Sequence, residues 1–181
     1  MFTQEQEQQI VQKILNGDKE QYRVIVNEYQ NVVANLCYKL VGNKLEVDEV
    51  TQQVFVELYT ALPRFRHESR LGTFIYRITI NVTSKMLKYD KRHVSYEQEG
   101  NDEYKTADYQ QSYEEQIMKE EQYRKLHEAI GMLKYEQRTA LVLFSFKGLS
   151  YNDIADIMQV SLPKVESLIF RAKKNLQKML T

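Results

Sequence analysis

The chain has 181 residues, of which 43% are hydrophobic and 28% charged, which is typical of one or two small globular domains. Its 25 basic and 25 acidic side chains balance, its six glycines and two prolines are few for a turn-rich sheet protein, and its single cysteine excludes an internal disulfide. No apolar run is long enough to cross a membrane and the first residues lack a secretory signal pattern, so we expect no membrane insertion.

In chain order, apolar residues at helical spacing predict four helices in the first half. A short stripe covers 10–15, and a longer one ends at Val41 after an expected helix cap at Asp18. Further stripes cover 47–62 and 72–91. Residues 93–116 contain almost no aliphatic side chains, so we expect a flexible acidic linker there.

The second half predicts a further helical unit. A helical pattern over 126–147 ends at Gly148, a residue type favoured just past a helix end. Ser150-Tyr-Asn-Asp153 is a helix-start motif, a turn follows at 159–161, and a last helix runs to about residue 180. No segment shows a convincing strand pattern. The expected fold class is therefore all-α, with two small helical domains joined by the linker.

The zero net charge conceals an uneven distribution along the chain. Residues 61–93 carry 8 basic and 2 acidic side chains, residues 94–121 carry 2 and 9, and residues 160–181 carry 5 and 1. Two basic segments separated by an acidic one are typical of a protein that binds a polyanion through an interrupted surface.

The last two predicted helices have the pattern of a helix-turn-helix. Val165 and Ile169 would face the first of these helices, which leaves one stripe of the second exposed. That stripe, with the expected cap at the helix start, contains hydroxyl and cationic side chains: Ser161, Lys164, Ser167, Arg171 and Lys174. Such side chains suit phosphates and base edges in a major groove. A helical hairpin with a solvated basic face is the alternative.

A second basic surface is predicted on the helix at 72–91. Arg77, Asn81 and Lys85 share one face, and Phe65 and Phe74 lie close to them in the sequence. Cations bind a nucleic-acid backbone, and aromatic rings can stack on unpaired bases. The alternative is that the aromatic rings belong to the core and the basic face is solvated.

The helix at 47–62 has a polar exposed face, and the sequence offers little support for catalysis. Asp48, Glu49, Gln52, Gln53 and Glu57 lie on that face, which could equally be an ordinary solvated surface. The three histidines are widely spaced, and neither a phosphate-binding loop nor a nucleophile motif is present. We therefore expect no enzyme, no catalytic residue, no metal and no cofactor.

Several ordered motifs along the chain can be compared with known families. Three lie in the first half: Asp48-Glu-Val-Thr-Gln-Gln-Val-Phe55, Leu62-Pro-Arg-Phe-Arg-His-Glu-Ser69, and Thr73-Phe-Ile-Tyr-Arg-Ile78 with Asn81. Two lie in the second half: Gly148-Leu-Ser-Tyr-Asn-Asp-Ile-Ala155 and Ile169-Phe-Arg-Ala-Lys173. The first three resemble region 2, and the last two region 4, of the extracytoplasmic-function sigma factors of bacterial RNA polymerase. The resemblance implies region 2 at 1–92, a linker at 93–116 and region 4 at 117–181.

The resemblance also implies roles for individual residues. Asp48, Glu49, Gln52, Gln53 and Phe55 would bind the clamp helices of the polymerase core. Residues of the loop and of the following helix would recognise and open the −10 element and capture a flipped base: Phe65, Arg66, Arg70, Phe74, Arg77, Asn81 and Lys85. The last helix, with Ser161, Lys164, Ser167, Arg171 and Lys174, would read the −35 element.

The implied partners are the polymerase core, at its clamp helices and flap, promoter DNA and an anti-sigma factor, all in the cytoplasm. Three positions depart from the family: Phe74 stands where a tryptophan is frequent, and Glu166 and Leu168 stand where many members have a basic residue. The last two predict weaker or altered −35 reading. A helix-turn-helix regulator that works without polymerase is the alternative function, and a helical enzyme or adaptor is a rival from another class.

Overall fold

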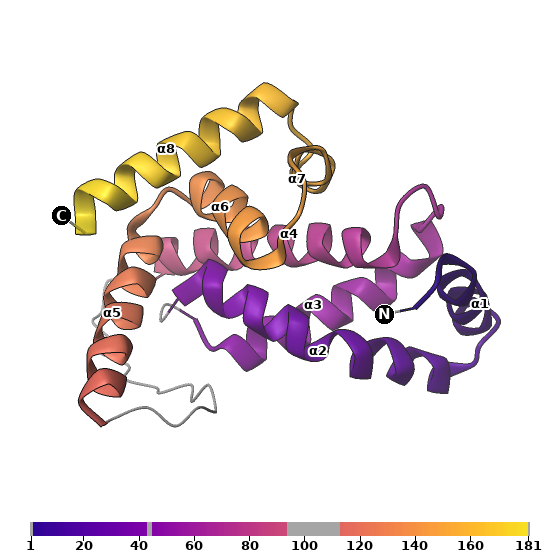
Figure 1. The fold of residues 1–181 in the computed structure, drawn as a ribbon. Coiled ribbons are helices and arrows are strands. Elements are labelled where there is room, and N and C mark those ends of the chain that lie inside the picture. Colours follow the sequence, from indigo (N-terminus) through magenta and orange to yellow (C-terminus); the bar gives the residue numbers. More distant parts are fainter. Residues whose placement is uncertain (1, 43–44, 94–112, 181) are drawn as a thin grey trace.

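The computed structural model describes residues 2–42, 45–93 and 113–180, which form helices joined by short turns and contain no strand (Figure 1). The α-helices are α1 (Gln4–Leu15), α2 (Lys19–Val41), α3 (Val47–Ala61), α4 (Leu71–His93), α5 (Tyr113–Met132), α6 (Tyr135–Lys147), α7 (Tyr151–Met158) and α8 (Leu162–Leu180). A short 3-10 helix, η2 (Leu62–Arg64), follows α3. The expected all-α class is confirmed.

Local sequence signals explain where several helices begin and end. Thr3 and Gln6 form a reciprocal capping box at the start of α1, and Ser150 and Asp153 form another at the start of α7. The Asp18 side chain accepts a hydrogen bond from the backbone N–H of Glu20 at the start of α2. After α6, Gly148 adopts a left-handed conformation with φ of 62°, which costs glycine little because it has no Cβ.

The first module consists of α1 to α4 packed around one hydrophobic core. The fully buried side chains include Ile25 and Val33 from α2, Leu58 from α3 and Ile75 from α4. Along α3, for example, Val47, Val50, Val54 and Leu58 are buried at the helical period, so the helix turns its apolar face inward.

The second module consists of α5 to α8, and it packs directly on the first. Its core joins Ile154 of α7 and Ile169 of α8 to Leu36 and Leu40 of α2 and to Tyr76 and Ile80 of α4. Helix α7 packs on α4 and α6 packs on α2, and Figure 1 shows α7 next to α4. The two expected helical units are both present, and they share a buried interface that the sequence did not indicate.

The ends of the expected linker at 93–116 are helical. Helix α4 extends to His93 and α5 begins at Tyr113, while 94–112 lie outside the described residues. Among the helices that the structure describes, none is long and apolar enough to span a membrane.

Candidate functional site

Helices α7 and α8 form the predicted helix-turn-helix and present its basic stripe. Val165, Ile169 and Ala172 are almost fully buried on the inner face of α8. On the outer face Ser161, Lys164, Arg171 and Lys174 are exposed, and Ser167 is half-buried. The Lys164 Nζ atom lies 3.2 Å from a carboxylate oxygen of Glu136 on α6. The five predicted residues therefore line one outward stripe, although one of its cations already has a partner.

Leu168 and Phe170 on α8 do not follow the expected pattern of exposure. Leu168 is only 5% exposed and belongs to the shared core, so its lack of charge removes no phosphate contact, and the expectation that it weakens −35 reading is wrong. Glu166 is exposed. Phe170, one turn after Glu166, is 67% exposed and was missed. Its signal in the sequence is an aromatic residue outside the apolar register of Val165 and Ile169.

Helix α4 presents the second predicted basic row, and part of it is covered by α7. The Arg77 Nη2 atom donates a hydrogen bond of 3.0 Å to the backbone carbonyl of Asp156 on α7. The Arg77 Nε atom is buried and has no protein partner. Asn81 and Lys85 are exposed, and the Lys85 Nζ atom lies 3.4 Å from Glu57 on α3. In this arrangement Asn81 and Lys85 are open to a ligand, whereas Arg77 is partly covered by α7.

The loop between η2 and α4 contains the remaining residues predicted to contact the −10 element. Phe65 is 8% exposed and its ring centre lies 4.9 Å from that of Phe74, which is half-buried, so both rings contribute to packing. Arg66 is exposed at the tip of the loop. Arg70 is engaged by the buried carboxylate of Glu7 from α1, at 3.1 Å. The aromatic side chains therefore follow the packing alternative, and Arg66 remains open.

The polar face of α3 is exposed as predicted, apart from Glu57, which is half-buried beside Lys85 of α4. Asp48, Glu49, Gln52 and Gln53 are exposed. Phe55 is only 9% exposed and packs in the first core, because it falls within the apolar stripe of α3. It therefore shapes the helix position and does not share the exposed surface.

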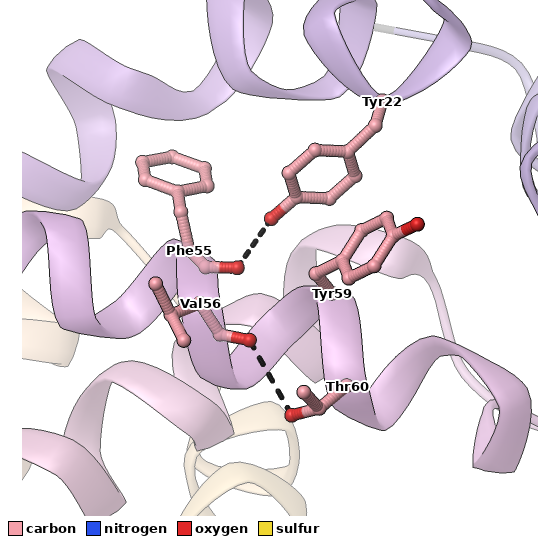
Figure 2. Close-up of a pocket in the computed structure, with 5 residues that line it drawn as sticks. All are labelled: Tyr22, Phe55, Val56, Tyr59 and Thr60. Atoms are coloured by element: carbon pink, nitrogen blue, oxygen red, sulfur yellow. Dashed lines mark hydrogen bonds between the residues drawn. The ribbon is translucent and has the colours of Figure 1, made fainter. Parts of the chain in front are cut away.

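A small apolar hollow extends this face of α3 (Figure 2). It has a volume of about 320 Å³ and is lined by Tyr22, Phe55, Val56, Tyr59 and Thr60. The Tyr22 hydroxyl donates to the backbone carbonyl of Phe55, and its ring packs edge-on against Tyr59 at 4.9 Å. Burial raises the pKa of Tyr22. Val56 and Tyr59 are 57% and 42% exposed, and together they offer an apolar contact surface.

Sequence reasoning missed this apolar part of the surface. Gln52, Val56 and Tyr59 are spaced by four and three residues, so they lie on one stripe of the helix. That spacing is the signal of this surface in the sequence.

A buried arginine ties the two modules together. Arg138 on α6 is 4% exposed, and desolvation lowers its pKa. It donates to the carbonyl of Leu40 at the end of α2, and to those of Ile130, Gly131 and Leu133 around the end of α5. The last carbonyls of a helix have no partner within the helix, so one guanidinium satisfies acceptors at two helix ends.

A tyrosine and a histidine complete this interface. The Tyr135 hydroxyl donates to the carbonyl of Ile80 at 2.7 Å and lies 2.6 Å from the Thr83 hydroxyl, and burial raises the pKa of Tyr135 to about 12. The His127 ring stacks on Tyr38 of α2 at 4.4 Å. Within the part of the chain that the structure describes, no three His, Cys, Asp or Glu side chains are grouped closely enough to hold a metal ion.

Comparisons with known proteins point to one family. Residues 25–93 match the model described as Sigma-70 region 2, and residues 123–176 match the model described as Sigma-70, region 4. The chain is 36% identical to the RNA polymerase sigma-H factor of Pseudomonas aeruginosa, over 99% of this chain and 96% of that protein. It is 32% identical to the ECF RNA polymerase sigma-E factor of Escherichia coli K12, over 96% and 94%.

Two solved structures have a similar fold. One is CnrH in complex with the cytosolic domain of CnrY, with a TM-score of 0.67, 19% identity and 96% of each chain covered. The other is the sigma factor RpoE in complex with the anti-sigma factor NepR from Bartonella quintana, with a TM-score of 0.64, 19% identity, and 90% of this chain and 97% of that one covered.

Proposed function

Because the chain belongs to the extracytoplasmic-function group of the sigma-70 family, we propose that it binds core RNA polymerase and directs transcription initiation at promoters with particular −10 and −35 elements. One observation carries this function: an exposed basic stripe on α8 and a partly exposed one on α4 lie on separate helical modules of one chain, which also presents a polar face on α3. A regulator that works without polymerase would not need the α3 surface, so that alternative is not favoured. This function places the chain in the cytoplasm, where the polymerase works. It requires no catalytic step by the chain itself.

The α3 surface is the part that we assign to the polymerase core. Asp48, Glu49, Gln52 and Gln53 supply exposed polar groups, and the hollow at Val56 and Tyr59 supplies an apolar patch next to them. Interfaces between proteins commonly combine an apolar centre with a polar rim. We therefore extend the expected core-binding surface to the hollow, and we assign Phe55 a packing role under it.

The outer stripe of α8 is assigned to the −35 element. Lys164, Arg171 and Lys174 can neutralise phosphates, while Ser167 can donate or accept at a base edge. Phe170 can contact a thymine methyl group, and Glu166 can accept from a cytosine amino group. This mixture predicts a −35 preference that depends on apolar and acceptor contacts as well as on cations.

The part of α4 that contains Asn81 and Lys85 is assigned to the −10 element, together with the loop 65–70 before the helix. Arg66, Asn81 and Lys85 are exposed and supply cations and an amide for an unpaired strand. Capturing a flipped base would offset part of the cost of unpairing, which is a few kcal/mol per base. DNA melting would therefore draw on binding energy.

Promoter binding requires the two modules to separate. The two elements are named for positions about 25 base pairs apart, which corresponds to about 85 Å of B-DNA. Modules that share a core cannot reach both elements together, and Arg77 is held by Asp156 of the second module. We propose that 1–92 and 117–181 are the two modules that move apart and that 93–116 links them. The family-model matches at 25–93 and 123–176 support these two modules.

The arrangement in which the two modules share a core is called the closed arrangement. An anti-sigma factor is a natural partner for it. One of the similar structures is a sigma factor in complex with such a protein. A protein that binds both modules at once would stabilise the arrangement in Figure 1 against the open form, since a ligand shifts an equilibrium toward the state that it prefers.

Reconstitution with sigma-free core polymerase tests the proposed function. The purified chain should produce promoter-dependent transcripts and should bind core. Asp48→Arg should weaken core binding at least tenfold, whereas Glu5→Arg, a charge reversal at an exposed position on α1, should leave core binding unchanged. Failure of the wild-type chain to bind core or to support any initiation would remove the proposal.

A further inference from the structure

Helix α1 contacts the loop 65–70 through a buried carboxylate. Glu7 is 2% exposed, although most of its neighbours on α1 face solvent. Its oxygens accept hydrogen bonds from Arg70 Nε at 3.2 Å, from Arg70 Nη2 at 3.1 Å and from the backbone N–H of Leu71 at 3.1 Å. Arg70 Nη2 also donates to the carbonyl of Phe2 at 2.6 Å. Residues more than sixty positions apart are thereby joined at one point.

The burial of Glu7 is not needed for α1 itself. The start of α1 already has a complete capping box from Thr3 and Gln6. The Glu7 carboxylate instead lies at the start of α4, where Leu71 is the first helical residue, and a negative charge is stabilising at a helix N-terminus. A buried charge is costly unless it is paired and hydrogen-bonded, and Arg70 with Leu71 satisfies that need. The contact therefore fixes the junction between the loop and α4.

The loop itself has a conformation that its surroundings must maintain. His67 has a φ of 57°, a left-handed value that is uncommon for a residue with a side chain. Its ring packs edge-on against Phe65 at 4.6 Å. His67 also lines a hollow of about 480 Å³ with Gln8, Gln9 and Gln12 of α1. One end of the loop is held by the Phe65 ring, and the other by Glu7.

We infer that Glu7 is a positioning residue for −10 recognition, acting through Arg70 and the start of α4 to hold the loop 65–70 in the form that receives an unpaired DNA strand. This inference rests on the proposed role of the loop in binding the −10 element. It assigns Arg70, whose side chain is 52% exposed, to the ion pair with Glu7, and it assigns the phosphate contact to Arg66.

Glu7→Gln tests the inference, with Glu5→Gln as the matched control. Both substitutions remove one carboxylate from α1, and Glu5 is exposed. Holoenzyme made with each variant is titrated with a fluorescent oligonucleotide that carries the non-template −10 strand of a promoter from which the wild-type enzyme initiates. Glu7→Gln should bind this strand about tenfold more weakly and discriminate less against base changes in it. Its affinity for core and for a −35 duplex should match that of Glu5→Gln.

A second variant separates positioning from direct contact. Arg70→Lys keeps a positive charge for any phosphate but loses the guanidinium fork that binds Glu7 and Phe2. Under the inference it behaves like Glu7→Gln, and combining the two changes adds little further loss. Normal strand binding by both variants, or equal losses for the −10 strand, core and the −35 duplex, would overturn the inference. If wild-type holoenzyme initiates normally in that case, the proposed function stands without it.

Discussion

Replacing Arg138 by methionine tests how strongly the buried interface holds the closed arrangement. Methionine keeps much of the apolar volume but removes every donor, which leaves the carbonyls of Leu40, Ile130 and Leu133 without this partner. A hydrogen bond to a charged group contributes about 1.5–3 kcal/mol, and relief of burying the guanidinium offsets part of the total. We expect the free energy of unfolding to fall by about 3 kcal/mol.

Urea unfolding measures this loss directly. The chain has 13 tyrosines and no tryptophan, so tyrosine fluorescence can be followed beside far-ultraviolet circular dichroism. With a urea dependence of about 2 kcal/mol per molar, the midpoint should fall by about 1.5 M. Arg124→Met, at an exposed position on α5, should move the midpoint by less than about 0.3 M. Equal midpoints for the two variants would refute the assigned role of Arg138.

Three other predictions concern the interface and the DNA surface. Burial lowers the pKa of His127, with the charges of Lys39 and Arg138 acting in the same direction, so below the unfolded pKa of about 6.5 the unfolded chain binds more protons than the folded one. The free energy of unfolding should therefore fall between pH 7 and pH 5, and His127→Phe should reduce this fall; an unchanged slope would contradict the reasoning. Arg171→Ala should weaken binding of holoenzyme to a −35 duplex and lower its salt slope by about 1, and an unaltered slope would exclude a phosphate contact. Phe170→Ala should cost about 1 kcal/mol at a −35 site that contains thymine but much less where uracil, which lacks the methyl group, replaces that base; equal losses at both would rule out the methyl contact.

The helical elements and the two basic rows could be predicted from the sequence because they depend on local periodicity. Val165 and Ile169 mark the inner face of α8, and that assignment leaves Lys164 and Arg171 on the outer face. The same rule placed Asn81 on the open face of α4. Periodicity of this kind reports which side of a helix is buried, and one stretch of sequence is enough to read it.

The long-range polar contacts could not be predicted in this way. Glu7 and Arg138 look like ordinary charged residues on helices, since nothing near them in the sequence marks a partner. Their burial depends on Arg70 and on the carbonyl of Leu40, which belong to distant segments. Leu168 is a different case: the apolar period of α8 already places it on the inner face beside Ile169, and only the family comparison placed it on the DNA face. The packing of α8 agrees with the period.

The contacts of Arg77 explain why polymerase and DNA would both be needed to open the molecule. A DNA phosphate is a stronger acceptor for Arg77 than the neutral Asp156 carbonyl, because it adds charge–charge attraction to a hydrogen bond whose donor is already charged. Exchange of that one bond favours DNA, but opening also exposes the contacts of Arg138 and Tyr135 and the shared apolar core. One arginine cannot offset that loss. Docking of the two modules at separate sites on the polymerase would supply the remainder, so the isolated chain should bind promoter duplex far more weakly than the holoenzyme does.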